Sequence, residues 1–221
     1  MSYQFDFSDL WSYRAVFAKG IWLTLMLTAV GCTLGIAVGI GGAASRQYGP
    51  KWLRWVFGTY VELIRNTPFL VQLFFIFFGL PAMGVKLGEL QAAVITVVVN
   101  LGAYSTEIIR AGLAATPRGQ VEAAESLAMS GPQIFRHVVL VPALRRIWPA
   151  LSSQCVIVML GTAVCSQISA EELTFAANFI TSRNFRNFEV YFVTTGIYLV
   201  LAIGLRYAFR LLGRFALGLR T

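Results

Sequence analysis

Charged residues are scarce in this sequence, and acidic ones are the scarcest. Asp, Glu, Lys and Arg make up 13% of the 221 residues, against ~25% in ordinary globular proteins. Ten acidic residues stand against eighteen basic ones, for a net charge of +8. Disorder requires low hydrophobicity and high charge, so the composition excludes a disordered chain. The basic residues lie at the ends of apolar runs and form no patch, which argues against a nucleic-acid-binding domain.

The residue sets of common enzymes are missing as well. His137 is the single histidine, and the sequence has no Gly-x-Ser-x-Gly motif. None of the three lysines lies in a P-loop, so the chain cannot hold ATP in that way. Cys32, Cys155 and Cys165 form no CxxC pair and lie in apolar runs, which favours small buried hydrophobic residues. We therefore predict no catalytic residue, no metal site and no cofactor bound by this chain.

Long apolar runs are what the sequence does have. Hydrophobic residues make up 57% of it, and the mean hydropathy is +0.69. About 20 apolar residues are needed to cross the ~30 Å hydrocarbon core of a bilayer, and five runs approach that length. We predict an all-α integral membrane protein, one domain over 1–221, with five transmembrane helices. The predicted spans are about 16–45, 56–80, 87–113, 147–168 and 187–211.

The distribution of Lys and Arg predicts the orientation. With five spans, only five of the eighteen basic residues lie on the side of the N-terminus: Arg14, Lys19, Lys86, Arg183 and Arg186. Cytoplasmic segments carry the excess of Lys and Arg, so we expect a periplasmic N-terminus and a cytoplasmic C-terminus. The first run is too long for a signal peptide.

The segment 114–146, between the third and fourth predicted spans, is long and rich in helix formers. Thr116-Pro117 predicts one helix start, and Ser130 with Gln133 predicts a second through a capping box. Gly131 is expected to end the first helix in a sharp turn with positive φ. We expect two short helices lying flat under the membrane. The first helix has small residues and little aromatic or basic character, which favours a protein partner, with a lipid-lying helix as the alternative.

Three blocks of this sequence resemble a known family. Glu122-Ala123-Ala124, then Gly131, then Leu140-Val141-Pro142 are similar to the EAA loop in permease subunits of bacterial ABC importers. The segments YSTEIIRAGLAATPRGQVEAAESLAMSG and YVELIRNTPFLVQLFFIFFGLP resemble the polar amino acid uptake family, which includes histidine, glutamate, glutamine and cystine permeases.

The resemblance implies a non-catalytic permease subunit in the bacterial inner membrane. It would translocate a polar amino acid, delivered by a periplasmic binding protein, into the cytoplasm. The implied partners are a dimer of ABC ATPase subunits that carry the ATP and Mg, and a second permease, the same chain or a paralogue. The substrate and the lipid bilayer are the remaining partners, and no nucleic acid is expected. In this family the EAA helix docks on the ATPase, and Glu122 would be the anchoring charge. The coupling residues that the resemblance implies are Glu122, Ala123, Ala124, Gly131 and Pro142.

Polar residues within the spans are the candidates for the substrate path, since such groups face a bundle interior. On the third span Asn100, Tyr104 and Glu107 share one helix face. Interhelical hydrogen bonds, or a Glu107–Arg110 pair, are the structural alternative. Where relatives carry a charge followed by Thr-Ser-Leu, this chain has Leu-Gly-Thr-Ala-Val, which implies a roomier pocket or one that lies mainly in the partner. The candidates on the fourth span are Gln154, Gly161, Thr162, Ser166 and Gln167.

Several features leave two interpretations open. Gly31, Gly35 and Gly39 lie four residues apart, which is typical of helix packing within a subunit or of a subunit interface. Pro68 either kinks the second span or marks where it enters the bilayer. The charged outer loop 169–189 is a candidate docking surface or an ordinary solvated face. A self-contained channel or ion-coupled carrier is the alternative function, but it leaves a structured cytoplasmic segment unexplained, and five helices lack the inverted repeats of carriers.

Overall fold

The computed structural model describes residues 5–218, and these residues form helices and no strands. Arg220, which the charge count places in the cytoplasm, lies outside them. The elements are η1 (Ser8–Tyr13), α1 (Arg14–Tyr48), α2 (Lys51–Arg65), α3 (Phe69–Phe74), η2 (Phe75–Gly79), α4 (Leu80–Ala82), α5 (Glu89–Ala114), α6 (Arg118–Ser126), α7 (Gly131–Gln133), η3 (Ile134–Leu140), α8 (Val141–Gly161), η4 (Thr162–Ile168), α9 (Leu173–Asn184) and α10 (Asn187–Leu217).

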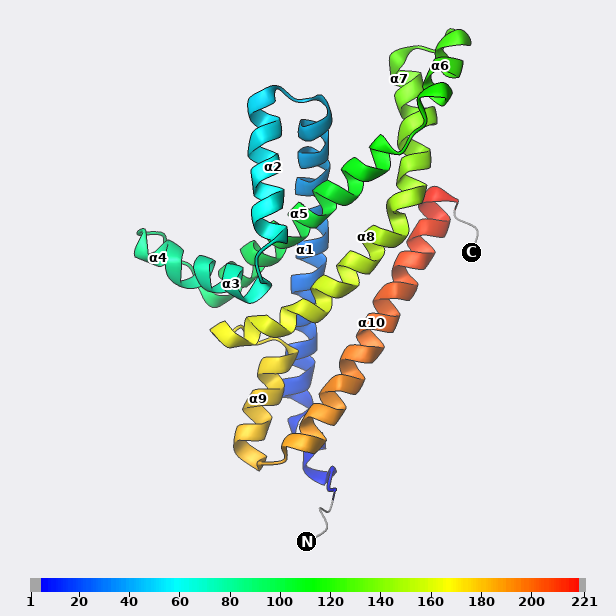
Figure 1. The fold of residues 1–221 in the computed structure, drawn as a ribbon. Coiled ribbons are helices and arrows are strands. Elements are labelled where there is room, and N and C mark those ends of the chain that lie inside the picture. The colour runs from blue at the N-terminus through cyan, green and yellow to red at the C-terminus, as the bar shows by residue number, and fades with distance from the viewer. Residues whose placement is uncertain (1–4, 219–221) are drawn as a thin grey trace.

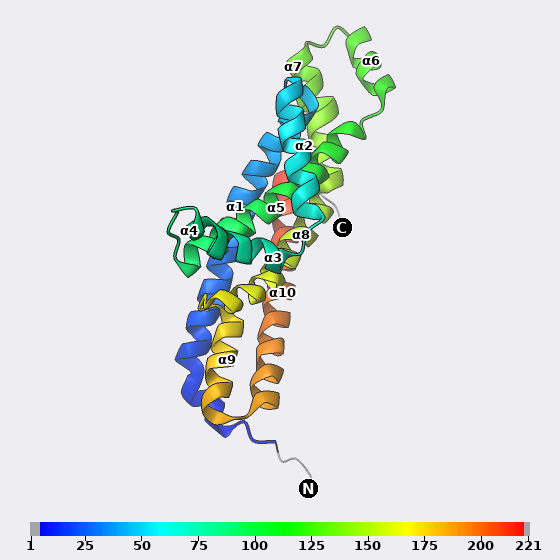
Figure 2. The same ribbon diagram turned by 60° about the vertical axis from the view of Figure 1, so that its left-hand side comes forward.

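The helices form an elongated bundle whose two ends differ (Figures 1 and 2). The N-terminal segment, the end of α9 and the start of α10 lie together at one end, and α6 lies at the other. We call these the N-terminal end and the α6 end. Four helices are long and apolar enough to cross a membrane, or five spans if a bent pair counts as one. The predicted class, an all-α membrane protein, is confirmed. The helices α1 and α10 cover the predicted spans 16–45 and 187–211, and α5 covers the predicted span 87–113 from residue 89 onward.

The glycine stripe of α1 packs inside the subunit. A Cβ added at Gly35 would lie 2.9 Å from the Cβ of Leu101, which real side chains do not tolerate. A Cβ at Gly31 or Gly39 would lie closer still to the same helix, α5, at 2.3 and 2.4 Å. Small residues let two helix backbones approach closely, so the packing interpretation of this stripe applies. The three cysteines are free and buried, as expected.

The second predicted span, 56–80, is broken in the structure. Lys51–Arg65 and Phe69–Ala82 meet at an angle of 113°. The break falls at Pro68, which has no N–H to donate and whose ring disfavours a helical conformation of the preceding residue. Of the two interpretations of Pro68, the structure shows the kink, and the two parts point in very different directions. Hydropathy cannot reveal this, because the two parts taken together are long and apolar enough to be one span.

The segment after α6 also differs from the expectation. The second short helix is not separate, because the chain is helical without a break from Gly131 to Ile168, over 38 residues. The capping box is present: the side-chain Oε1 of Gln133 accepts from the backbone N–H of Ser130 at 2.8 Å. Nothing after it ends the helix. The wider π-helical turns of η3 directly precede Pro142, where a regular helix would clash with the proline ring.

Candidate functional site

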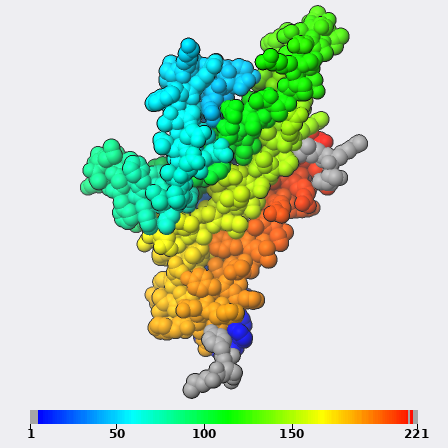
Figure 3. All heavy atoms as spheres, viewed as in Figure 1, coloured from blue at the N-terminus to red at the C-terminus, as the bar shows by residue number. Residues whose placement is uncertain are grey.

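Helix α6 stands clear of the bundle and carries the EAA residues. Figure 3 shows this region as a knob at one end of the molecule. Ala124 is the one buried residue of α6, 3% exposed, and it faces inward where α6 packs against η3. Glu122 and Ala123 are exposed. Leu127, directly after the helix, is 78% exposed. The helix therefore presents a small, partly apolar surface with a free carboxylate.

The turn after α6 is made by Ala128 and not by Gly131. Ala128 has φ +56°, and the N–H of Met129 donates to the carbonyl of Ala124 at 3.2 Å, which closes the helix end in a Schellman motif. Gly131 instead begins the next helix, so the expected positive φ at Gly131 is wrong. Alanine rarely adopts this conformation, so no sequence signal identified Ala128. A Cβ at Gly131 would meet no atom within 4 Å.

Asn100 is engaged in a network at the helix break. Its Nδ2 donates to Oε1 of Gln72 at 2.9 Å. Nε2 of Gln72 in turn donates to the carbonyl of Ile64 at 2.7 Å and to that of Thr67 at 3.0 Å. In a continuous helix, residue 68 would donate to the carbonyl of Ile64, but it is Pro68. Gln72 replaces that missing donor and, with Asn100, joins the break to α5.

Tyr104 and Glu107 are also partnered. The guanidinium of Arg65 lies 5.6 Å from the centre of the Tyr104 ring, in a cation–π contact. Glu107 pairs with Arg110 on its own helix and with Arg46 of α1, where Nη1 and Oε2 are 2.7 Å apart. The structural alternative, a Glu107–Arg110 pair, is thus present in this structure. Arg46 is a further partner that spacing along one helix cannot reveal.

The candidates on the fourth span do not form one cluster. The buried hydroxyls of Thr162 and Ser166 donate to the backbone carbonyls of Met159 and Ala163 at 2.7 and 2.8 Å. Gln154 is half-buried and Gln167 is exposed. A Cβ at Gly161 would meet nothing within 4 Å, so the space beside it is open. Within residues 5–218 no hydrogen bond joins these residues to the three candidates on α5.

Pro142, the last predicted coupling residue, is half-buried within the continuous helix. It lies on α8, whereas Glu122, Ala123 and Ala124 lie on α6 and Gly131 begins α7.

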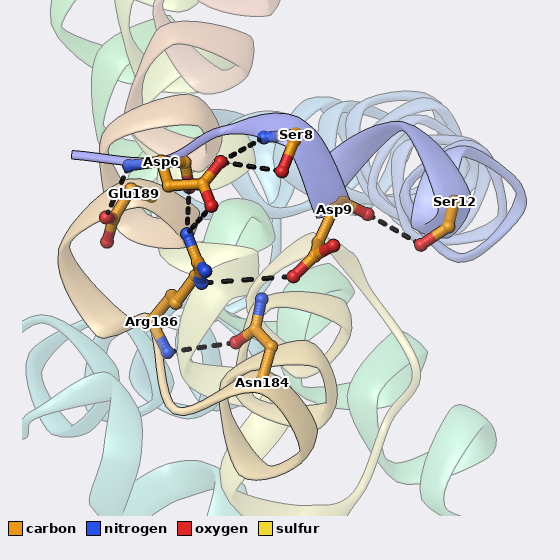
Figure 4. A network of polar contacts seen from close by, with 7 residues as sticks. All are labelled: Asp6, Ser8, Asp9, Ser12, Asn184, Arg186 and Glu189. Atoms are coloured by element: carbon orange, nitrogen blue, oxygen red, sulfur yellow. Dashed lines mark hydrogen bonds and ion pairs between the residues drawn. The ribbon is translucent and has the colours of Figure 1, made fainter.

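The N-terminal segment is clasped to the start of α10, as Figure 4 shows. Arg186 pairs with Oδ2 of Asp6 at 2.7 Å and donates to the backbone carbonyl of Asp6 at 2.8 Å. The N–H of Asp6 donates to Oε1 of the buried Glu189 at 3.2 Å. Hydrogen bonds from the Ser8 side chain and backbone, helped by Arg186, lower the pKa of Asp6 to about 2. We call these contacts the N-terminal clasp.

A second joint, at the start of α9, is fully buried. Glu172 is 0% exposed, and its carboxylate accepts from the N–H of Phe175 at 2.8 Å and from the hydroxyl of Tyr198 at 2.6 Å. Burial raises the pKa of the Glu172 carboxyl above its usual range. The N–H of Leu173 donates to Thr24 of α1 at 3.2 Å. This joint, which the sequence analysis missed, ties α9 to α1 and α10. It also removes Glu172 from the outer surface that segment 169–189 was expected to present.

A family model described as the binding-protein-dependent transport system inner membrane component matches residues 31–216. The chain belongs to this family. The resemblance found in the sequence is thereby confirmed, and the relatives of this permease-family chain are amino acid ABC permeases.

Two curated relatives and one solved structure place the chain within the permease family. The glutamine transport system permease protein GlnP of Escherichia coli is 32% identical over 213 residues, which cover 96% of this chain and 97% of GlnP. The L-cystine transport system permease protein TcyB of Bacillus subtilis is 37% identical over 182 residues, 82% of this chain and 78% of TcyB. A chain in the crystal structure of an amino acid ABC transporter with histidines is 34% identical, with a TM-score of 0.88 and coverage of 96% and 99%.

Proposed function

We propose that this chain is the membrane subunit of an ATP-driven importer that moves a polar amino acid into the cytoplasm. A periplasmic binding protein delivers the solute, and separate ATPase subunits hydrolyse the ATP. The observation that carries the proposal is the exposed helix α6 with its EAA residues, on a chain that matches GlnP along almost its whole length. The glutamine and cystine in the names of its relatives define the substrate class to test.

We assign the contact with the ATPase to α6. Glu122 and Ala123 offer a charge and a small side chain on its exposed side, while Ala124 holds the helix to η3. Gly131, exposed and without neighbours that a Cβ would meet, leaves space for a partner surface. Pro142 belongs to this coupling set through its place where η3 passes into α8. A contact with the ATPase requires α6 to be cytoplasmic, which makes the N-terminal clasp periplasmic. The distribution of Lys and Arg supports this orientation.

The substrate path follows from the polar residues of α5, α8 and η4. We keep Asn100, Tyr104 and Glu107 as lining candidates, although each has a partner within the chain. A transported amino acid carries an ammonium and a carboxylate. As it passes, these groups would replace the present partners of the three side chains. On α8, the open space beside Gly161 can accommodate a side chain of the substrate or of a second permease. The remaining proposed lining residues are Gln154, Thr162, Ser166 and Gln167.

Reconstitution tests the proposal. Liposomes that contain the chain, its ATPase subunits and its binding protein should accumulate labelled glutamine, cystine or histidine only when ATP is present. Glu122→Arg should abolish this uptake. Glu125→Arg, the same charge change at another exposed position of α6, is the matched control and should retain more than half of it. Uphill uptake by the chain alone would support the carrier alternative and overturn the proposal.

A further inference from the structure

A cluster of aromatic rings lies at the N-terminal end, where the N-terminal segment, residues 5–13, meets the start of α10. Phe5 packs on Phe188 with ring centres 5.1 Å apart, and Phe7 packs on Phe192 at 6.3 Å. Phe188 and Phe192 are themselves stacked at 6.2 Å. These four side chains, the aromatic cluster, still remain between 43% and 64% exposed. An exposed apolar patch of this kind is typical of a surface that meets a partner or a membrane.

The N-terminal segment also exposes its rings while it pairs its charges. Both acidic residues of the segment, Asp6 and Asp9, pair with Arg186, as Figure 4 shows. Its two phenylalanines are exposed instead, and Trp11 of η1 is 74% exposed. In water the reverse arrangement is favourable, because burial of rings stabilises a fold and an exposed carboxylate needs no partner. The segment therefore suits surroundings that are less polar than water.

The aromatic cluster lies where two spans begin. The predicted spans 16–45 and 187–211 both start at this end of the molecule. The N-terminal segment directly precedes the first of them, and Phe188 and Phe192 open the last. Both α1 and α10 are long and apolar enough to cross a membrane. The cluster is therefore level with the boundary between hydrocarbon and headgroups, the depth at which aromatic residues concentrate in membrane proteins.

The aromatic cluster is continuous with an exposed apolar face of α10. A shallow groove of about 540 Å³ begins at the cluster and reaches Thr195, one turn before Leu199. Leu199, Val200 and Ile203 are exposed farther along the helix. These residues lie inside the predicted span 187–211, where the surroundings are hydrocarbon. The cluster is therefore the headgroup-level end of a surface that faces the bilayer.

We propose that the N-terminal segment lies in the membrane surface, with its aromatic side chains among the glycerol and carbonyl groups of phospholipids. The indole N–H of Trp11 can donate to these oxygens. Arg14, whose guanidinium lies 5.7 Å from the centre of the Trp11 ring, is exposed and can bind a lipid phosphate. The N-terminal clasp holds the segment on α10 at this depth. The contact is with the outer leaflet if α6 is cytoplasmic, as the proposed function requires.

Depth-dependent quenching of Trp11 fluorescence tests this contact. The full chain is placed in nanodiscs of phosphatidylcholine brominated either near the headgroup or near the chain end, and the signal of Trp11→Phe is subtracted to isolate Trp11. We expect bromine near the headgroup to quench Trp11 at least twofold more strongly, and aqueous iodide to quench it weakly. Trp22 is the depth control, since it is exposed on α1 and about 16 Å farther along at ~1.5 Å per residue. Isolated in the same way, it should show the reverse order.

Two variants test whether the N-terminal clasp positions the segment. Arg186→Gln removes the cation of the clasp and should release the segment, so that headgroup-level quenching of Trp11 falls at least twofold and quenching by iodide rises. Arg183→Gln is the matched control, because Arg183 stacks on Phe179 of α9, with 4.3 Å between the guanidinium and the ring centre. It should leave the quenching of Trp11 unchanged.

Four results would overturn the proposal. Stronger quenching by bromine near the chain end would place Trp11 in the hydrocarbon. Strong quenching by iodide that the periplasmic binding protein removes would make the segment a docking surface. No quenching by any agent would mean that protein covers Trp11, and native quenching in Arg186→Gln would remove the role of the clasp. None of these measurements involves transport, so failure of this proposal is distinguishable from failure of the importer function.

Discussion

The two ends of this molecule are built in opposite ways. In the half of the molecule that holds the N-terminal end, polar contacts join distant segments. The clasp joins Asp6 to Arg186, 180 residues apart, and the buried joint at Glu172 joins α9 to α1 and to α10, through residues 149 and 26 apart. At the α6 end lies a nine-residue helix in which Ala124 is buried against the bundle, Val121 is half-buried and the other seven residues are exposed. One end uses its polar residues for internal contacts, and the other leaves them exposed, where we propose that the ATPase binds.

This difference separates stability from coupling. A buried carboxylate is favourable only while its hydrogen-bond donors stay in place, so the joint at Glu172 fixes the arrangement of three helices. An exposed helix such as α6 contributes little to the free energy of unfolding, because few of its groups leave water. We therefore expect substitutions at the N-terminal end to change stability and those at the α6 end to change transport.

The largest expected effect is on transport, at Gly131. Gly131→Asp should lower ATP-dependent uptake more than tenfold while the melting temperature stays within about 2 °C, because a Cβ there meets no atom of the chain. The matched control is Gly88→Asp at the N-cap of α5, near which only the side chain of Gln91 lies. Gly88→Asp should preserve both the uptake and the melting temperature. A fall in melting temperature for Gly131→Asp alone would contradict the separation of stability from coupling.

Next in size is the loss of the buried joint. Glu172→Ala leaves the hydroxyl of Tyr198 and the N–H of Phe175 without their acceptor, at a cost of about 3 kcal/mol in the free energy of unfolding. Thermal unfolding in detergent measures it. Glu171→Ala, which removes the exposed carboxylate that pairs with Lys19, should cost less than about 1 kcal/mol. Similar losses in the free energy of unfolding for the two variants would show that the joint at Glu172 stabilises the fold no more than a surface ion pair does.

A smaller effect of opposite sign is expected at the turn after α6. Ala128→Gly relieves the left-handed conformation and should stabilise α6 by about 1 kcal/mol. The same exchange at Ala123, inside the helix, should destabilise α6 by about 1 kcal/mol. Protease protection of segment 114–131 measures both, and equal signs would contradict the Schellman geometry.

The smallest effect is the pH dependence of the N-terminal clasp. Because the pKa of Asp6 is lowered to about 2 in the folded chain, the folded state binds this proton less readily than the unfolded one. The clasp therefore stabilises the segment above the ordinary pKa of Asp, near 3.8, and loses that contribution as the pH falls towards 2. Hydrogen exchange of residues 5–10, corrected for the intrinsic rate, should rise more between pH 5 and pH 3 in the native chain than in Asp6→Asn.

The sequence predicted the features that depend on local chemistry. Charge-free runs locate α1, α5 and α10, because length and hydropathy are sufficient to define a spanning helix. The capping box at Ser130 marks a true helix start. Sequence could not show that the helix continues from there to Ile168, because the rules for ending a helix are weaker than those for starting one.

The candidate sites were less predictable, because their partners lie far apart in the chain. Spacing placed Asn100 and Glu107 on one face of α5, but it could not reveal that Gln72 and Arg46 would engage them. Gln72 carries a signal in hindsight, since it is a lone amide in an apolar stretch four residues after a proline. Glu172 carries none, because a carboxylate beside a second one usually indicates a solvated surface.

The unbroken helix from Gly131 to Ile168 also sets the scale of any movement it transmits. Its 38 residues, at ~1.5 Å per residue, follow a path of about 57 Å, nearly twice the thickness of the hydrocarbon core. The path bends between η3 and α8 (Figure 1), where π-helical turns interrupt the regular hydrogen bonding. A displacement of the α7 end therefore reaches Ile168 along one helix but through a bend, and the bend is the place where the two parts can change their mutual angle.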